Sequence, residues 1–253
     1  FCDLSDTAKK ARIPSKYTPD INSSESIDWI NSKNPDVIFC FGWSRLIKKE
    51  LLNLPPIGVI GFHPAELPKN RGRHPIIWAL TLGLKQTAST LFFMDEGADS
   101  GDILSQKIIK IEKNDNAKML YSKIANTAIS QLEESLPKLK DNTFIKISQN
   151  SECSNTWRKR GYSDGEIDWR MSSEGIYNLV RALSDPYVGA HFLFNEKEIK
   201  LWECSIVKEN NPNMEPGKFL YYGKHGPIIK AGIDAIEIIK SEPKIKLDIG
   251  DYL

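Results

Sequence analysis

Short apolar runs that alternate with helix-like stretches constrain the fold of this 253-residue chain more than any other feature. Residues 37–41 and 57–62 are almost wholly apolar, which is typical of strands buried on both faces of a parallel sheet. Residues 26–32 and 75–82 favour helices, and residues 116–136 predict a long amphipathic helix that ends near Pro137. Residues 87–94 and 105–112 predict two more strands. This order predicts an α/β fold built on a parallel sheet.

Two polar loops between these elements hold the side chains that can do chemistry. The stretch GFHPAELPKNRGRHPIIW, residues 61–78, is rich in Gly and Pro, so it predicts a loop that presents His63 at the end of a strand. The stretch MDEGADSGDIL, residues 94–104, places Asp99 in a turn after the third strand. Because the carboxyl ends of parallel strands share one edge of a sheet, we expect His63 and Asp99 to meet there. Such a pair suits acid–base work or a charge-stabilised histidine.

The second half of the chain has a different pattern. Residues 149–163 are polar and basic, as in a linker, and a helix capped by Ser172 or Ser173 follows. From Ala190 onward, short alternating runs separated by turn residues predict a small antiparallel β subdomain. We therefore expect two domains, residues 1–148 and 149–253.

Composition excludes several classes of function. The 34 basic and 33 acidic residues give a net charge of +1, which leaves no electrostatic footprint for nonspecific nucleic-acid binding. No run approaches the ~18 apolar residues of a membrane helix, and the first residues lack the apolar core of a signal peptide, so we expect no membrane partner and a cytoplasmic location. The cysteines are too far apart for a disulfide framework or a zinc site, so no metal is expected: Cys2, Cys40, Cys153 and Cys204.

Three ordered blocks resemble one known family. HPAELPKNRGRHPI, from His63, resembles the H-x-S-L-L-P-x-x-R-G-x-x-P-I signature of folate-dependent formyltransferases, and GADSGDIL resembles their aspartate loop. Residues 164–190 are similar to the start of the small C-terminal domain of that family. The resemblance implies a Rossmann-like formyltransferase domain in residues 1–148 and a β-rich C-terminal domain in residues 149–253. It also implies that the first βαβ unit of the family domain is missing here.

The resemblance implies a reaction and roles for particular residues. In this family a primary amine attacks the formyl carbon of 10-formyltetrahydrofolate; the residue matching His63 stabilises the oxyanion, and the one matching Asp99 orients that histidine and takes a proton. Arg71 and Gly72 are expected either to contact an anionic group of the substrate or to brace the His63 loop. The expected walls of the folate pocket are Phe41, Gly42 and Trp43 on one side and Met94, Glu96, Gly97 and Ala98 on the other.

One departure from the family pattern lies beside His63. The family has an asparagine two residues before the histidine, as a second donor to the oxyanion, and this chain has Gly61. The loss of one such donor costs on the order of 3 kcal/mol in the barrier. We expect Asn70, His74 or a water molecule to take its place.

The amine that accepts the formyl group stays open between several classes. A nucleotide-linked amino sugar is favoured, because RGRHPIIWAL, residues 71–80, looks more like sugar formyltransferases and because a tRNA enzyme should carry a basic stripe. Methionyl-tRNA, and an amine on a peptide or siderophore precursor, are the alternatives. A homologue that binds ligand or a partner protein without catalysis is a further one, and a homodimer is among the expected assemblies.

Overall fold

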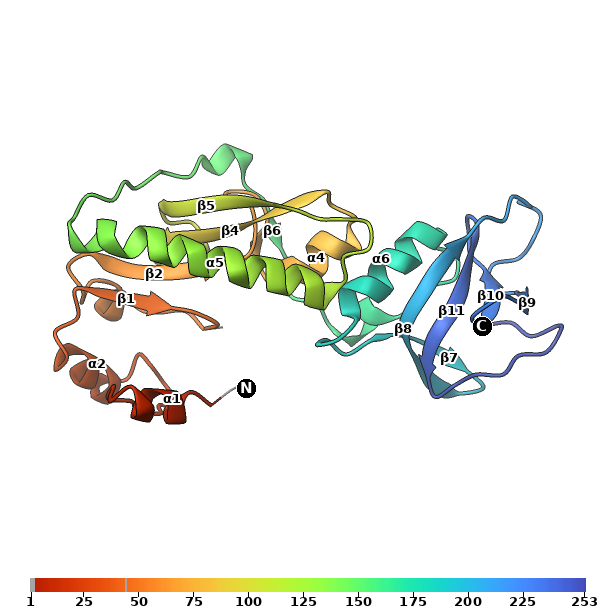
Figure 1. Ribbon diagram of the computed structural model, residues 1–253, viewed down its shortest axis with the longest axis horizontal. Helices are drawn as coiled ribbons and strands as arrows, with labels where there is room; N and C mark the ends of the chain where they lie inside the picture. Colours follow the sequence, from red (N-terminus) through yellow and green to blue (C-terminus); the bar gives the residue numbers. More distant parts are fainter. Residues whose placement is uncertain (1–2, 44) are drawn as a thin grey trace.

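The computed structural model describes residues 3–43 and 45–253, so the prediction for Cys2 lies outside the described residues. Figure 1 shows two lobes along the long axis of the molecule. The first lobe contains the N-terminal end, one long helix and a four-stranded sheet, and the second contains a five-stranded sheet and the C-terminus. The division of the chain at residues 148 and 149 stays a prediction, because β6 (Thr156–Trp157) pairs with β3 (Arg71–Gly72) of the first lobe.

The sheet of the first lobe has the strand order β1-β2-β4-β5. β1 (Val37–Cys40) and β2 (Gly58–His63) are parallel, and Val37 pairs with Gly58. β4 (Gln86–Phe93) is antiparallel to β2, and β5 (Ile103–Lys110) is antiparallel to β4. The α/β fold class is confirmed, but within this four-stranded sheet only β1 and β2 are parallel.

The direction of β4 follows from the path of residues 64–85, which connect it to β2. A parallel strand needs a crossover that carries the chain back along the full length of the sheet. The one helix between β2 and β4 is α4 (Pro75–Thr81), and a helix of seven residues is about 10 Å long. It packs against α6 (Ser173–Leu183) at one end of the sheet (Figure 1) and does not span it. The chain therefore re-enters the sheet near the edge at which it left.

Helix α5 (Ala117–Lys140) covers one face of this sheet (Figure 1). The Asn116 side chain accepts the Met119 N–H and begins the helix. The predicted end near Pro137 is wrong, since the helix continues through Pro137 to Lys140. Pro137 lacks one N–H, but Leu139 is buried against Ile60, and this packing stabilises the last turn.

Shorter elements cover the opposite face. These are α2 (Ser24–Asn31) and α3 (Lys49–Leu52), and Leu51 packs with Val59 of β2. The preceding helix, α1 (Ser5–Lys10), has no buried residue. The predicted linker then returns to the His63 loop, where β3 (Arg71–Gly72) pairs with β6 (Thr156–Trp157). Two 3₁₀ turns, η1 (Ser151–Cys153) and η2 (Tyr162–Gly165), flank β6. The linker is therefore part of the wall around the loop.

The second lobe confirms the predicted β-rich subdomain. Ser172 caps α6, and five antiparallel strands follow in the order β7-β8-β11-β10-β9. Their bounds are β7 (Ala190–Phe194), β8 (Lys197–Val207), β9 (Phe219–Tyr222), β10 (Pro227–Lys230) and β11 (Ala235–Glu242).

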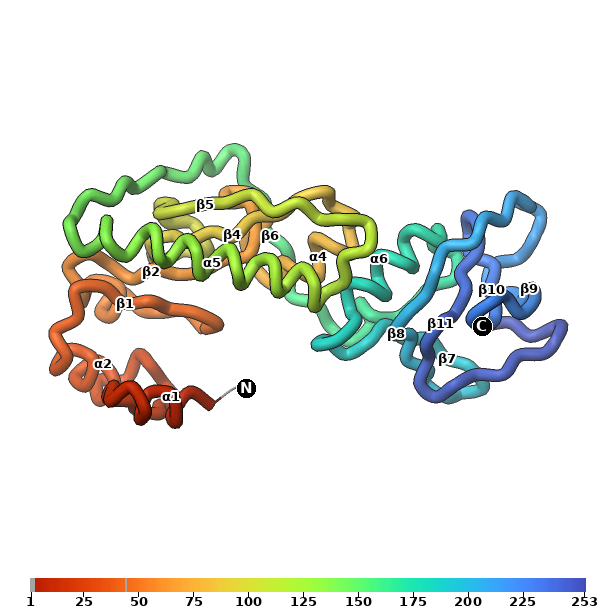
Figure 2. Tube along the Cα trace, viewed as in Figure 1, coloured from red at the N-terminus to blue at the C-terminus, as the bar shows by residue number. Residues whose placement is uncertain are grey.

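One apolar core joins the lobes. Leu80 of α4, Leu120 of α5, Ile176 of α6 and Leu201 of β8 belong to the same buried cluster. Figure 2 traces the backbone from the first lobe into the second. Within residues 3–43 and 45–253, no helix is both long enough and apolar enough to cross a membrane.

Candidate functional site

His63 is the last residue of β2 and is 4% exposed. Its Nε2 lies 2.7 Å from the carbonyl oxygen of Asn70, so this nitrogen carries a proton and donates it. Its Nδ1 lies 3.6 Å from Oδ2 of Asp99. The structure thus brings the two predicted catalytic residues together, at a separation slightly longer than a direct hydrogen bond.

Asp99 reaches His63 because its loop folds back over the sheet. β4 runs antiparallel to β2, so strand direction alone does not place Asp99 at the carboxyl end of β2. The loop closes on itself where the Phe93 N–H donates to the Asp102 carbonyl, and Asp99 adopts a left-handed backbone with φ of 55°. Its Oδ2 accepts the Gly72 N–H at 2.8 Å. This bond fixes the carboxylate in front of His63.

Gly72 has a structural reason to be glycine. Its φ is +96°, and a Cβ there would lie 2.3 Å from the carbonyl oxygen of Trp157. The close approach allows β3 to pair with β6 while the Gly72 N–H points at Asp99. Gly72 therefore acts in this site through its backbone.

Gln149 is a residue of the site that the sequence did not reveal. Its Oε1 accepts two hydrogen bonds from the Arg71 guanidinium, at 3.2 and 2.7 Å. Its Nε2 donates to the carbonyl oxygens of Asp99 and Gly101, at 2.9 and 2.7 Å. Arg71 thus braces the loop, which is one of its two expected roles. No local pattern could have found Gln149, because its partners are about 50 and 80 positions away.

Asn155 holds the other side of the loop and was also missed. Its side-chain oxygen accepts the Asn70 N–H at 2.8 Å, and its backbone carbonyl accepts the Arg71 N–H at 3.0 Å. Asn70 is in the left-handed region with φ of 63°, which turns its carbonyl towards His63. The polar segment predicted as a linker therefore positions both the carbonyl and the carboxylate that contact His63.

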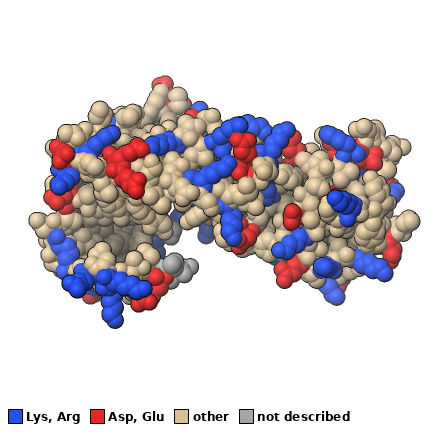
Figure 3. All heavy atoms as spheres, in the orientation of Figure 1, with Lys and Arg blue, Asp and Glu red and all other residues tan. Residues whose placement is uncertain are grey.

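The first predicted folate wall is open and aromatic. Phe41 and Trp43, after β1, are 45% and 40% exposed. Gly42 between them has φ of +66°, and no atom lies within 4 Å of where its Cβ would be. Figure 3 shows the molecule hollowed between β1 and the segment of α1 and α2. Exposed aromatic faces beside open backbone fit a flat ring such as a pterin.

The second predicted wall is a tight turn. The Asp95 carboxylate accepts the Gly97 N–H at 2.9 Å, and a Cβ on Gly97 would lie 2.1 Å from the Ser100 hydroxyl. Glu96 is exposed, with its carboxylate 3.5 Å from Lys49 Nζ, and Ala98 is exposed next to it. Met94 is half-buried at the start of this turn. The turn leaves the backbone of 96–98 accessible.

Gly61 lies in a space that other side chains fill. A Cβ there would come within 2.9 Å of Met94 Cγ and of the Phe92 ring. Of the expected substitutes, Asn70 offers its carbonyl to His63, and the Nδ1 of His74 accepts the Arg160 N–H at 3.4 Å. Desolvation by burial, followed by the charge of Arg160, lowers the pKa of His74. His74 lines a cavity between the lobes.

The described part of the chain contains no group of three or more His, Cys, Asp or Glu side chains that could hold a metal ion. Cys40 and Cys204 are free thiols, and burial raises their pKa values to about 11 and about 12, respectively.

Comparison with known proteins identifies the relatives of this chain. Residues 5–136 match the formyl transferase family, and residues 160–253 match the formyl transferase C-terminal domain. The bifunctional polymyxin resistance protein ArnA of Wigglesworthia glossinidia brevipalpis is 34% identical over 242 residues, which are 96% of this chain but 36% of ArnA. The chain thus spans about a third of that relative. The methionyl-tRNA formyltransferase of Caldanaerobacter subterraneus subsp. tengcongensis is 36% identical over 92% of this chain and 75% of that protein.

A solved structure shows the same fold. The N-formyltransferase from Helicobacter canadensis, in complex with folinic acid and dTDP-3-aminofucose, has a TM-score of 0.70 at 20% identity. The match covers 93% of this chain and 82% of that protein.

Proposed function

Since this chain belongs to the formyl transferase family, we propose that it transfers a formyl group from 10-formyltetrahydrofolate to a primary amine. The observation that carries the proposal is the buried His63 with Asp99 at 3.6 Å, held by the loop backbone at Gly72. In this reaction the acceptor nitrogen forms a bond to the formyl carbon, the bond from that carbon to the folate nitrogen breaks, and a proton moves from the amine to the folate.

Asp99 accepts the proton of the amine, and His63 stabilises the oxyanion. Asp99 Oδ2 is shared between Gly72 and His63, while Oδ1 makes no hydrogen bond to the described residues and is free to accept the amine proton. A proton at Nδ1 of His63 makes an imidazolium that Asp99 stabilises, and this cation stabilises the oxyanion. Because the ring is buried, water screens this charge poorly.

The donor would supply the formyl group, and the open aromatic wall would hold its pterin ring. We assign this wall to Phe41, Gly42 and Trp43, and the facing wall to Met94, Glu96, Gly97 and Ala98. Arg71 and Gly72 complete the site: the Gly72 N–H binds Asp99 directly, and Arg71 supports it through Gln149.

We favour a nucleotide-linked amino sugar as acceptor. The net charge is +1, and basic and acidic side chains are interspersed on the face shown in Figure 3, which offers no single basic stripe for a phosphate backbone. The related structure from Helicobacter canadensis contains a nucleotide-linked amino sugar. The second candidate is methionyl-tRNA, because the Caldanaerobacter enzyme is 36% identical.

A direct assay separates these candidates. The protein is incubated with 10-formyltetrahydrofolate and, in parallel, a panel of nucleotide-linked amino sugars or methionyl-tRNA, and the formylated product is measured by mass. We expect product with at least one amino sugar and none with the tRNA. Product with the tRNA alone would identify methionyl-tRNA as the acceptor in place of the amino sugar. Folate binding without any product would indicate a homologue without catalysis.

A further inference from the structure

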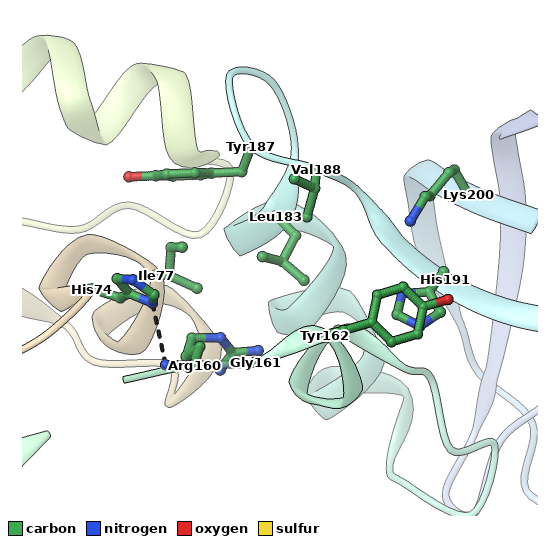
Figure 4. A pocket seen from close by; sticks show the side chains of 11 residues that line it. His74, Ile77, Arg160, Gly161, Tyr162, Leu183, Tyr187, Val188, His191 and Lys200 are labelled. Atoms are coloured by element: carbon green, nitrogen blue, oxygen red, sulfur yellow. Dashed lines mark hydrogen bonds between the residues drawn. The ribbon is translucent and has the colours of Figure 1, made fainter. Parts of the chain in front are cut away.

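A cavity of about 540 Å³ lies between the two lobes. It is enclosed by the start of α4, by η2, by the end of α6 and by β7 and β8, and Figure 4 shows its lining side chains. Ile77, Leu183, Tyr187 and Val188 give it an apolar wall. Its volume is within the ~300–1,000 Å³ of small-molecule sites. None of the predicted catalytic or folate residues lines it.

A buried cation forms part of the lining. Arg160 is 9% exposed, and its guanidinium donates to the carbonyl of Asp164 and lies 4.6 Å from the centre of the Trp78 ring. It forms no ion pair within residues 3–43 and 45–253, because the Asp164 carboxylate binds Arg158 and the Gly161 N–H. A buried cation whose neighbouring carboxylate, Asp164, is already paired with Arg158 is costly to keep. An anionic ligand in the cavity would compensate it.

A buried histidine with an unused nitrogen is also part of the lining. His191 is 3% exposed, and its Nε2 has no hydrogen-bond partner among the described side chains and backbone groups. Its ring lies against Tyr162, with centroids 4.2 Å apart, as Figure 4 shows. Buried polar atoms are seldom left without a partner, and this one lies covered behind the cavity wall. Burial and the nearby Lys200 lower the pKa of His191.

We propose that this cavity binds a small molecule made of a flat ring and an anionic group. The anion pairs with Arg160, and the ring lies on the apolar wall of Leu183 and Tyr187, near the covered ring of His191. A nucleoside monophosphate and an aromatic carboxylate both have this chemistry. Lys200 contributes less charge, since Glu198 lies 2.8 Å from it.

The proposal does not rest on formyl transfer, because binding is measured without a formyl donor. Isothermal titration of the full chain compares four probes: uridine monophosphate, uridine, benzoate and inorganic phosphate. Uridine monophosphate and benzoate have both a ring and an anion. We expect at least one of them to bind about ten-fold or more tightly than uridine, since a hydrogen bond to a charged group contributes ~1.5–3 kcal/mol. The ratio of the affinities for uridine monophosphate and benzoate distinguishes a nucleotide ligand from an aromatic carboxylate.

Two variants locate the binding in the cavity. Val188→Trp places a large ring at the exposed rim and should abolish binding, whereas Ile249→Trp, on an exposed position outside the cavity, should not. Arg160→Gln should remove the preference for the anion, and its thermal unfolding reports whether it still folds. The imidazole proton signal of His191 should shift on titration, and folinic acid should not displace the probe.

Three results would overturn the proposal. In the first, Val188→Trp binds the probe with the same affinity as the unchanged protein. In the second, the anionic probes bind no more tightly than uridine. In the third, folinic acid displaces the probe.

Discussion

The smallest scale at which this site can be understood is the His63 ring. Both of its nitrogens face protein groups, the Asn70 carbonyl on one side and Asp99 on the other. The carbonyl fixes the proton on Nε2, so any change of protonation during the reaction occurs at Nδ1, next to the carboxylate. The buried environment therefore defines which nitrogen exchanges a proton.

Replacement of His63 should remove the activity and keep the fold. His63→Ala deletes the proton donor and the cation, and we expect formyl transfer to fall by about 10²–10⁴-fold. Steady-state assays check this, with circular dichroism to confirm folding. His225→Ala, on an exposed residue of the second lobe, serves as control and should keep its activity. Near-normal turnover by His63→Ala would refute the catalytic assignment.

The charge of Asp99 can be removed almost without a change of shape. Asp99→Asn keeps an oxygen that can accept the Gly72 N–H, but it loses the proton acceptor and the partner of the imidazolium. We expect kcat to fall by about 10² or more while KM changes little. A variant with unchanged kcat but a raised KM would assign Asp99 to binding.

The third residue-scale prediction concerns Gly61, where this chain departs from the family pattern. A Cβ at this position would lie 2.9 Å from Met94 and Phe92, so Gly61→Ala should lower the free energy of unfolding by about 1–3 kcal/mol. Gly161→Ala is the matched control, because no atom lies within 4 Å of its Cβ position and its φ is −110°. Denaturant titrations compare the two. Equal stabilities would mean that Met94 and Phe92 move aside easily.

At the scale of elements, the sequence predicted which segments are strands and not how they pair. The runs that became β1 and β2 were recognisable because burial on both faces demands continuous apolar residues. The direction of β4 depends on where α4 packs, and this tertiary contact is not encoded in composition. The pairing of β3 with β6 was hidden for the same reason, since two-residue strands leave no periodic signal.

The sequence likewise predicted some residues of the candidate site and not others. His63 and Asp99 stand in recognisable motifs, while the side chains of Gln149 and Asn155 bind backbone groups that the fold brings near them. Sequence analysis finds side chains whose chemistry needs a particular residue type in a particular pattern. It does not find a glutamine that joins two distant loops.

The role of Gln149 in joining these loops is testable. Gln149→Ala leaves the Asp99 and Gly101 carbonyls without a donor, so we expect a loss of about 1–3 kcal/mol in stability and a lower kcat. Gln149→Glu keeps an acceptor for Arg71 but loses the donor, and it should impair activity as well. Gln86→Ala, which removes only an exposed hydrogen bond to Glu66, is the control. Full activity of Gln149→Glu would show that only the Arg71 bond matters.

At the scale of the whole molecule, the two lobes share one core. Leu80 and Leu120 from the first lobe pack in the same cluster as Ile176 and Leu201 from the second. Arg181 of α6 adds hydrogen bonds to the carbonyls of Glu112 and Asp115, at 3.2 and 3.1 Å. The division at residues 148 and 149 stays a prediction, and the shared core implies that the two parts do not unfold independently.

This coupling yields a final prediction for Ile176, which is fully buried where α6 meets the first lobe. Ile176→Ala should lower the free energy of unfolding by about 2–5 kcal/mol, because it leaves a cavity in the shared core. Native-state hydrogen exchange reports each lobe separately. The most protected amides of β4 and of β8 should lose protection by the same amount, since both open in one cooperative transition. Ile249→Ala, on an exposed residue, should change neither. If β8 alone loses protection while β4 keeps it, the lobes are independent units and the shared core does not couple them.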